Sequence, residues 1–310
     1  MRKFIGYETL INNFKDRCMN NTLSHAHLIA GEDGIGKSNL ANILAKLILN
    51  GELDREYVDI INYSSSKASF GVDDVRNIIE EVSKKPFEGE KKVIIIHEGN
   101  KLTIQAQNAL LKTIEEPPIG VHIIILCESL ELILDTIKSR CEIYKLTPLT
   151  KEELYEYIRI KKFDFNENDI KSAIAFSEGI PGRVDRYFND NNLKELRSKI
   201  IELIRDLNKN NVEIILQHEE NFIGLNDNKE EVLNILGGFI RDILIHKEVE
   251  NKNFIINGDK IDDINELTKE MSFRKLNNMI MTIEEARRNI KSNVSWAMTL
   301  RVMLMGFMEG

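Results

Sequence analysis

The sequence predicts an α/β domain built on a parallel sheet, followed by a region made only of helices. Three observations support this fold class. Short apolar stretches alternate with helical segments through residues 1–147, a glycine-rich turn follows the first of these stretches, and strand-like stretches end after residue 147. Alternation of this kind is typical of a parallel sheet with helices on both faces.

The first half of the chain is expected to contain five strands and the helices between them. Apolar stretches indicate strands at residues 26–30, 58–63, 92–96, 121–127 and 141–146. Helix-forming segments indicate helices at residues 7–20, 37–49, 72–84, 103–116 and 132–138. Two prolines end the fourth of these helices, because a residue before proline disfavours the helical conformation.

The second half, residues 148–310, is expected to be helical throughout. Thr150 and Glu153 have the spacing of a capping box, and three apolar stripes at helical spacing predict helix-bundle core. The stripes are Leu236, Phe239, Ile240, Ile243 and Leu244; Leu276, Met279, Ile280 and Ile283; and Val294, Ala297, Met298, Val302 and Met305. A polar stretch at 206–230 suggests a further boundary. We therefore expect domains at residues 1–147, 148–205 and 206–310.

Composition narrows the function classes. The 42 Lys and Arg residues against 50 Asp and Glu residues give a formal charge of −8, which excludes general electrostatic binding of nucleic acid and leaves only local contacts. Cys18, Cys127 and Cys141 form no C-x-x-C pair, so neither a zinc site nor a disulfide framework is expected. No apolar run of signal-peptide or membrane-span length occurs, so a cytoplasmic protein with no membrane contact is expected.

A complete phosphate-binding pattern, G-x-x-x-x-G-K-S, occupies residues 31–38. It stands between an apolar strand and an amphipathic helix, where glycines let successive N–H groups face a phosphate chain. The expected nucleotide-binding residues are Gly31, Gly34, Gly36, Lys37 and Ser38. In this chemistry the lysine reaches the β- and γ-phosphates of ATP or ADP, and the serine hydroxyl ligates Mg²⁺. Glu32 and Asp33 inside the loop are expected to face solvent.

The strand at 92–96 ends where phosphate-binding folds commonly place Asp-Glu, but His97 and Glu98 follow it here. An Asp at position 97 would hold Mg²⁺, whereas imidazole is a poor ligand for a cation that prefers oxygen. His97 has no partners at zinc-ligand spacing, and a partly exposed histidine at a strand end is the favoured interpretation. Phosphate binding therefore stays possible, while metal-assisted hydrolysis is expected to be weak or absent, with Glu98 vestigial.

Ser139, Arg140 and Cys141 stand just before the last predicted strand. An arginine at the rim of the domain can reach a neighbouring subunit and stabilise charge on a transferring γ-phosphate there. Periodicity alone favours the alternative, a plain surface arginine. Cys141 is expected to be a small buried residue, because no base stands near it in the sequence.

These segments together resemble a known family. The resemblance rests on LSHAHLIAGEDGIGKSNLA (23–41), FEGEKKVIIIHEGNKLTIQAQNALLKTIEEPP (87–118) and IKSRCEIY (137–144), and continues weakly through SEGIPGRVDRYF (177–188) and EARRNIKSNVSWAMTLRVMLM (285–305). They are similar to the AAA+ ATPase domain of bacterial sliding-clamp loaders, and more narrowly to the delta-prime subunits of DNA polymerase III. The resemblance covers nearly the whole chain.

The resemblance implies a P-loop AAA+ domain followed by a helical lid and an all-α collar domain that assembles a ring. It implies that Arg140 acts in trans on ATP held by an adjacent motor subunit, while this chain is a stator without effective hydrolysis of its own. The implied partners are motor and delta-type subunits in a hetero-pentameric ring, the sliding clamp, and primer-template DNA held by the assembled complex.

Two departures from the family pattern bear on cofactors. Many relatives carry a four-cysteine zinc module before the second strand, but residues 50–68 contain no cysteine, so no zinc is expected. Some relatives have a degraded phosphate loop, whereas this loop is complete and keeps ATP or ADP binding with Mg²⁺ open. Arg183 is loosely matched to the lid arginine that senses the γ-phosphate in motor subunits.

Two other functions remain open from the sequence. The first is an active ATP-hydrolysing motor of the same superfamily, supported by Lys37, Ser38 and Glu98. The second is a small-molecule phosphotransferase that uses the same loop. The second is disfavoured because the large helical half lacks a second basic motif that could clamp a substrate.

Overall fold

The computed structural model describes residues 4–64, 69–161, 165–207, 212–225, 228–249 and 254–308, and the chain forms two compact units. Unit 1 comprises Met1–Lys161 with Gly179–Gly182, and unit 2 comprises Lys162–Glu178 with Arg183–Gly310. The expected domain boundaries at residues 147 and 205 stay predictions, and part of the polar stretch at 206–230 lies outside the described residues. Among the described helices, none combines the length and the apolar character needed to cross a membrane.

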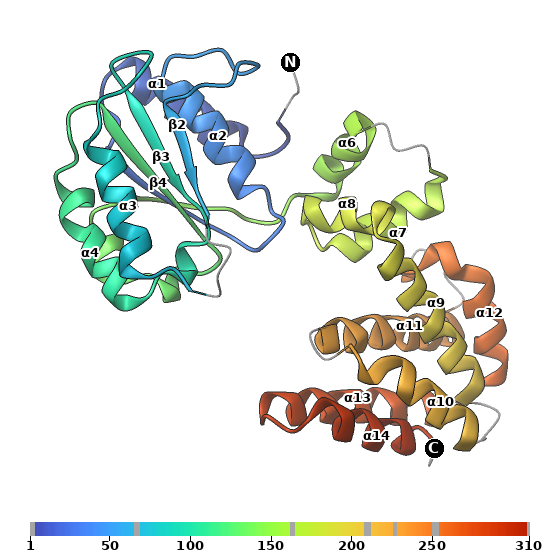
Figure 1. The fold of residues 1–310 in the computed structure, drawn as a ribbon. Coiled ribbons are helices and arrows are strands. Elements are labelled where there is room, and N and C mark those ends of the chain that lie inside the picture. The colour runs from blue at the N-terminus through green and yellow to red at the C-terminus, as the bar shows by residue number, and fades with distance from the viewer. Residues whose placement is uncertain are drawn as a thin grey trace. The chain divides into compact units, whose positions relative to one another are not determined.

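Unit 1 contains a five-stranded parallel sheet of order β2-β3-β4-β1-β5 (Figure 1). The strands are β1 (Ala26–Ala30), β2 (Ile60–Tyr63), β3 (Lys92–Ile96), β4 (Val121–Cys127) and β5 (Glu142–Lys145). β1 lies between β4 and β5, with Leu28 in register with Ile125 and Ile143. Because all strands run the same way, their carboxyl ends form one edge of the sheet, where ligands bind in open α/β folds.

Helices cover both faces of this sheet. They are α1 (Glu8–Met19), α2 (Lys37–Ile48), α3 (Val72–Ser83), α4 (Ile104–Glu115) and α5 (Asp135–Lys138); α6 (Lys151–Lys161) also belongs to unit 1 but contributes no residue to the two cores of the sheet. Ile94 and Ile96 share one apolar core with α3 and α4, while Val93 and Ile95 share the other with α1 and α2. Successive side chains of a strand point to opposite faces, so a strand buried on both faces reads as an unbroken apolar run. The strand and helix predictions for the first half are thereby confirmed to within a few residues.

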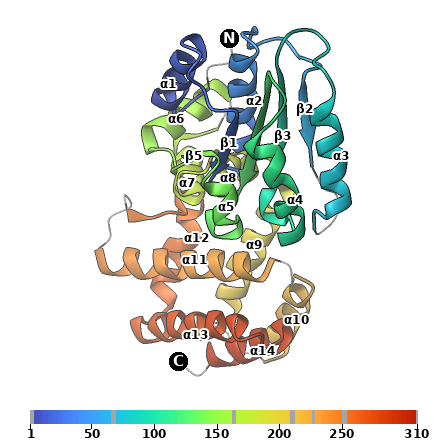
Figure 2. The same ribbon diagram turned by 90° about the vertical axis from the view of Figure 1, so that its left-hand side faces the viewer.

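The described residues of unit 2 form helices and the loops that join them, and no strand occurs among them (Figure 2). Its helices are α7 (Glu167–Ser177), α8 (Pro181–Asn189, whose first two residues belong to unit 1), α9 (Asn191–Asp206), α10 (Val212–Ile223), α11 (Lys229–Val249), α12 (Ile261–Glu270), α13 (Phe273–Lys291) and α14 (Trp296–Gly306). One apolar core joins residues of α9 to α14. The expected stripes along α11 and α13 lie in this core, which confirms them.

The third expected stripe is wrong. Met298, Val302 and Met305 of α14 are 64%, 51% and 55% exposed, and the buried face of that helix carries Trp296, Leu300, Met303 and Leu304 instead. The tryptophan decides the orientation, because its buried indole N–H donates to the carbonyl of Phe222 (2.9 Å). Both sides of α14 are apolar, so helical periodicity alone could not select the face that packs.

Two histidines lie on central strands of the sheet, His27 fully buried with its Nδ1 4.0 Å from Glu142 Oε2, and His122 partly buried. His27 on β1 is fully buried against Phe14 and Tyr144, and His122 on β4 lies 6.4 Å from it between ring centroids. Burial, followed by the neighbouring His122, lowers the pKa of His27 to about 3, and burial lowers the pKa of His122 to about 4. Charging an imidazole in an apolar site is unfavourable, so both rings are neutral in the folded protein.

This pair predicts that unit 1 loses stability in mild acid. Below the ordinary histidine pKa of 6.5 the unfolded chain takes up protons that the folded chain excludes until pH 4 to 3, so the free energy of unfolding falls as pH falls through that window. Each histidine contributes a slope of about 1.4 kcal/mol per pH unit. The free energy of unfolding, measured with urea between pH 7 and pH 4, should depend less steeply on pH in His27→Leu than in the wild type. An equal dependence on pH in both proteins would show that His27 is not neutral in the folded protein.

Candidate nucleotide site

The phosphate loop joins the carboxyl end of β1 to the start of α2. Gly34 and Gly36 have φ values of +79° and +107°, a backbone conformation that side chains other than glycine rarely adopt. Gly36 is the residue directly before Lys37, where α2 begins. The amino end of a twelve-residue helix therefore faces the carboxyl edge of the sheet, and this end attracts anions such as phosphate.

Lys37 is held inside the loop. Its Nζ donates to the carbonyls of Gly31 (2.7 Å) and Glu32 (2.8 Å). Burial lowers the pKa of Lys37, while Asp33 opposes that shift. The Glu32 and Asp33 side chains are exposed, as expected. A phosphate chain entering the loop would replace these carbonyls as the partner of the ammonium group.

His97 lies directly beside Ser38. Its Nδ1 is 3.3 Å from Ser38 Oγ, and its Nε2 is 2.8 Å from Asn62 Oδ1 on β2. An amide oxygen only accepts hydrogen bonds, so Nε2 carries the proton and Nδ1 accepts from the serine hydroxyl. Burial lowers the pKa of His97, which keeps the ring neutral at pH 7. The half-buried histidine therefore occupies the position expected for a metal-holding carboxylate.

The carboxylate of Glu98 is engaged in a local ion pair. Its backbone is left-handed (φ +53°), and its Oε1 forms an ion pair with Lys101 Nζ at 2.6 Å. The next residue, Gly99, is buried, and a Cβ there would meet the Ile125 side chain at 2.7 Å. The short turn after β3 is thus tightly packed, and the one carboxylate beside His97 in sequence already has a cationic partner.

The donors at this position do not fit Mg²⁺. This ion prefers oxygen ligands in near-octahedral geometry, but the group facing Ser38 is an imidazole. Over the described residues no three His, Cys, Asp or Glu side chains gather as a metal-binding group, and residues 65–68 of the cysteine-free segment lie outside them. The loop has the geometry to hold phosphates, and the group that faces Ser38 is an imidazole, while Asp33 and Glu128 are the carboxylates whose charge acts on Lys37.

A second segment of unit 1 packs directly on the phosphate loop. The Gly182 N–H donates to the Gly34 carbonyl (2.9 Å), and Leu149 N–H donates to the Gly179 carbonyl (2.8 Å). A Cβ on Gly182 would meet Gly34 Cα at 2.7 Å. Residues 179–182, which carry the start of α8, therefore contact the loop through backbone alone. Arg183, the next residue, belongs to unit 2 and pairs with Glu178 at 2.6 Å.

Arg140 lies away from the loop. It precedes β5 by two residues, and Glu142 of β5 is in register with His27 at the second position of β1. Arg140 is therefore at the amino edge of the parallel sheet, on the order of 20 Å from the phosphate loop at about 3.3 Å per residue. Its Nε donates to Glu115 Oε2 (3.0 Å) and its Nη1 to the Thr136 carbonyl (3.0 Å).

The structure therefore brings together Lys37, Ser38 and His97, places Glu98 beside them, and separates Arg140 from them. Sequence reasoning missed Asn62, Glu115 and Gly182. Asn62 left a weak signal, since it is the polar residue within the otherwise apolar strand Ile60–Tyr63. Gly182 left none, because its contact with the loop joins segments about 150 residues apart.

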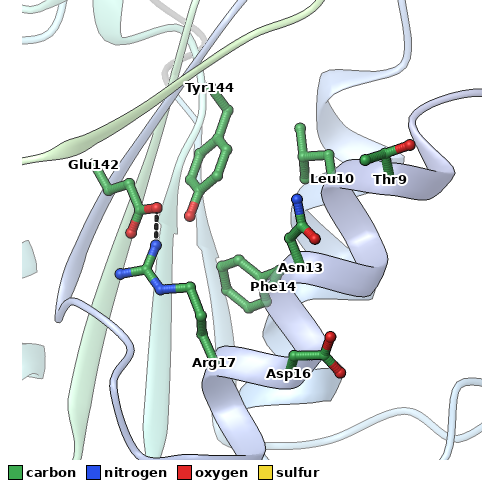
Figure 3. A pocket seen from close by; sticks show the side chains of 8 residues that line it. All are labelled: Thr9, Leu10, Asn13, Phe14, Asp16, Arg17, Glu142 and Tyr144. Atoms are coloured by element: carbon green, nitrogen blue, oxygen red, sulfur yellow. Dashed lines mark hydrogen bonds and ion pairs between the residues drawn. The ribbon is translucent and has the colours of Figure 1, made fainter.

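A separate hollow of about 670 Å³ lies between α1 and β5 (Figure 3). It is lined by Thr9, Leu10, Asn13, Phe14, Asp16, Arg17, Glu142 and Tyr144. Arg17 and Glu142 point toward each other across it and form an ion pair. The hollow includes no residue of the phosphate loop, and its strongest charges already neutralise each other.

The loop, the sheet order and the helical second unit define an AAA+ P-loop nucleotide-binding fold. Residues 6–150 match the family described as DNA polymerase III, delta subunit, and residues 191–307 match its C-terminal counterpart, DNA polymerase III, delta subunit, C terminal. The chain belongs to the clamp-loader family of DNA polymerase III subunits, which contains delta-prime, gamma and tau subunits.

Individual relatives agree with this membership. DNA polymerase III subunit delta-prime of Bacillus subtilis is 26% identical over 306 residues, covering 93% of this chain and 92% of that one. DNA polymerase III subunit gamma of Buchnera aphidicola is 27% identical over 201 residues, covering 57% of this chain and 54% of its own length. A gamma-subunit-related protein of Thermotoga maritima shares the fold, with a TM-score of 0.56 at 16% identity over 96% of this chain and 98% of that one.

The close contact between Gly182 and the phosphate loop predicts that adding one methyl group at Gly182 lowers the stability of the protein. Gly182→Ala places Cβ within 2.9 Å of two backbone atoms of Gly34, and the backbone must move to relieve the clash. We expect a loss of about 1–3 kcal/mol in the free energy of unfolding, as for other overpacked sites. Thermal melting should detect it. Gly89→Ala is the matched control, since nothing lies within 4 Å of a Cβ there, and equal effects in both variants would contradict the prediction.

Proposed function

We propose that this chain is the delta-prime-type stator of a clamp loader, which supplies Arg140 in trans to the ATP site of a neighbouring motor subunit. The observation that carries the proposal is the imidazole of His97 beside Ser38, where a hydrolysing subunit needs a carboxylate. A subunit that retains the fold but does not hydrolyse ATP can lose that carboxylate. Glu98, paired with Lys101, is then a vestige of the catalytic position.

The location of Arg140 supports the role in trans. The arginine lies at the amino edge of the sheet and the phosphate loop at the carboxyl edge, so Arg140 cannot serve the nucleotide of its own chain. Its side chain is 35% exposed and held by Glu115, which is 55% exposed. An exposed arginine of this kind can exchange a surface carboxylate for the phosphate of a partner, because guanidinium binds both in the same bidentate geometry.

The remaining parts of the proposal follow from family membership. The partners are motor and delta-type subunits in a hetero-pentameric ring, with the sliding clamp and primer-template DNA bound by the assembled complex in the cytoplasm. Residues 1–147 form the AAA+ domain, 148–205 the helical lid and 206–310 the collar that joins the ring. A net charge of −8 is compatible with this arrangement, because the ring as a whole grips the DNA and this chain needs only local contacts.

A specific observation favours one alternative, an active motor. The phosphate loop is complete, with Gly31, Gly34, Gly36, Lys37 and Ser38 all in place at the amino end of α2. Nucleotide binding is therefore part of the proposal for either role. The two functions differ in turnover, since only the motor requires hydrolysis at this loop.

The isolated chain is expected to bind ATP or ADP and to hydrolyse ATP slowly or not at all. Lys37→Ala should abolish binding, because the variant removes the cation that neutralises the phosphate chain. Equilibrium dialysis and phosphate release in one preparation measure both quantities. Turnover well above the roughly 10⁻⁴ s⁻¹ of a P-loop NTPase without an arginine partner, if it is lost in Lys37→Ala, would establish the motor and reject the stator.

Arg140→Ala is expected to slow ATP hydrolysis by the assembled complex while its assembly is unchanged. Removal of an arginine finger costs about 10³-fold or more in the rate of phosphoryl transfer at the affected site. The measurement is DNA-stimulated ATPase of the reconstituted ring, with size-exclusion chromatography to verify assembly. Arg76→Ala is the matched control, because Arg76 is a 73% exposed arginine of α3 paired only locally with Asp73. Equal rates for the two variants would reject the role in trans.

A further inference from the structure

His97 has the hydrogen-bonding arrangement of a metal ligand. A histidine that binds a metal through one ring nitrogen commonly donates the other N–H to an oxygen acceptor, which fixes the tautomer and the ring orientation. Here Nε2–H donates to Asn62 Oδ1 at 2.8 Å, and Asn62 is held on β2 opposite Ile95 of β3. The lone pair of Nδ1 is therefore held toward the loop before any ion binds.

The atom that Nδ1 faces is the loop hydroxyl that ligates the nucleotide's cation in this class of fold. Ser38 Oγ and His97 Nδ1 are 3.3 Å apart. Two donors at right angles on one ion with bonds of about 2.1–2.2 Å lie about 3 Å apart. The two atoms can therefore bind the same ion with a small adjustment, and the phosphate oxygens of the nucleotide would supply further ligands.

The chemistry of these donors selects among divalent ions. Mg²⁺ binds imidazole weakly, whereas first-row transition ions accept it, with affinity rising from Mn²⁺ to Co²⁺ and Ni²⁺. We propose that His97 and Ser38 form a nucleotide-dependent site for a divalent first-row transition ion, which this chain prefers to Mg²⁺. The inference rests on the proposed binding of nucleotide at the phosphate loop. It makes His97 a metal ligand, where the sequence favoured a partly exposed histidine with no function.

A second interpretation makes a different prediction. If His97 only accepts a hydrogen bond from Ser38 and fills space, the identity of the ion has no effect on nucleotide affinity. Of the nearby carboxylates, Glu98 is paired with Lys101 at 2.6 Å, and the charges of Asp33 and Glu128 act on Lys37. If His97 is a metal ligand, nucleotide affinity depends on the divalent ion, and this dependence is lost when His97 is substituted. If His97 only fills space, neither effect occurs.

The affinity test uses the full-length chain and a fluorescent ADP analogue. Titrations are run with Mg²⁺, Mn²⁺ and Co²⁺, each at a concentration that saturates the nucleotide. The wild type is expected to bind the analogue about tenfold or more tightly with Co²⁺ than with Mg²⁺, with Mn²⁺ between them. His97→Asp should reverse the preference, because a carboxylate suits Mg²⁺. Asn62→Ala should weaken it without reversing it, since that variant frees the ring but keeps the nitrogen.

A spectroscopic measurement tests the bond itself. In the Mn²⁺–ADP complex, electron spin-echo modulation should show coupling to ¹⁴N in the wild type and none in His97→Asp. His25→Asn is the matched control, because His25 bonds to the Ile114 carbonyl just before β1, at the other end of that strand from the loop. That variant should keep both the ¹⁴N coupling and the preference for Co²⁺.

Three results would overturn the inference: equal affinities with all three ions, the same preference in His97→Asp as in the wild type, or no ¹⁴N coupling in the wild type. Failure to bind nucleotide with any ion would overturn it as well. Failure to bind nucleotide would also remove the nucleotide binding included in the proposed function, whereas the other three results leave it intact. The role of Arg140 in trans is tested separately by the ATPase of the ring with Arg140→Ala.

Discussion

The inclusion of β1 between β4 and β5 is the constraint on which the rest of unit 1 depends. All five residues of β1 are buried, and its alternate side chains enter two separate apolar cores. A shift of β1 by one residue would exchange the side chains of those cores, which fixes its register. The loop that follows β1 is therefore held at one place on the carboxyl edge of the sheet, beside the end of β3. The pairing of Ser38 with His97 is a consequence of this register.

The same parallel order gives the two edges of the sheet different roles. Each strand ends at the edge where the phosphate loop and the turn after β3 lie. The segments that lead into strands lie at the opposite edge, and these include Arg140 and the end of α4 with Glu115. The phosphate loop and Arg140 thus occur in one domain without reaching each other. The proposed role of Arg140 in trans requires this separation.

The replacement of a carboxylate by His97 changes the chemistry of the site while the fold is retained. A neutral imidazole satisfies its two nitrogens with Ser38 and Asn62, so the half-buried ring leaves no polar atom without a partner, a condition that native structures rarely violate. Glu98 meets the same requirement through Lys101. The polar side chains of the turn after β3 therefore have partners within the chain. The proposed preference for a transition ion follows from the imidazole and requires no change of fold.

The α/β fold, the five strands, the phosphate loop and the His-Glu pair after the third strand can be read from the sequence, because they depend on local patterns of apolar residues, glycine spacing and single residue identities. Which partners those residues have depends on tertiary structure. Asn62 reaches His97 through the β2–β3 register, and Gly182 reaches Gly34 across about 150 residues of chain. The orientation of α14 also depends on tertiary structure. Both faces of this helix are apolar, and the hydrogen bond from Trp296 to the Phe222 carbonyl determines which face is buried. Contacts between distant segments are set by the packing of the whole unit, and no local pattern encodes them.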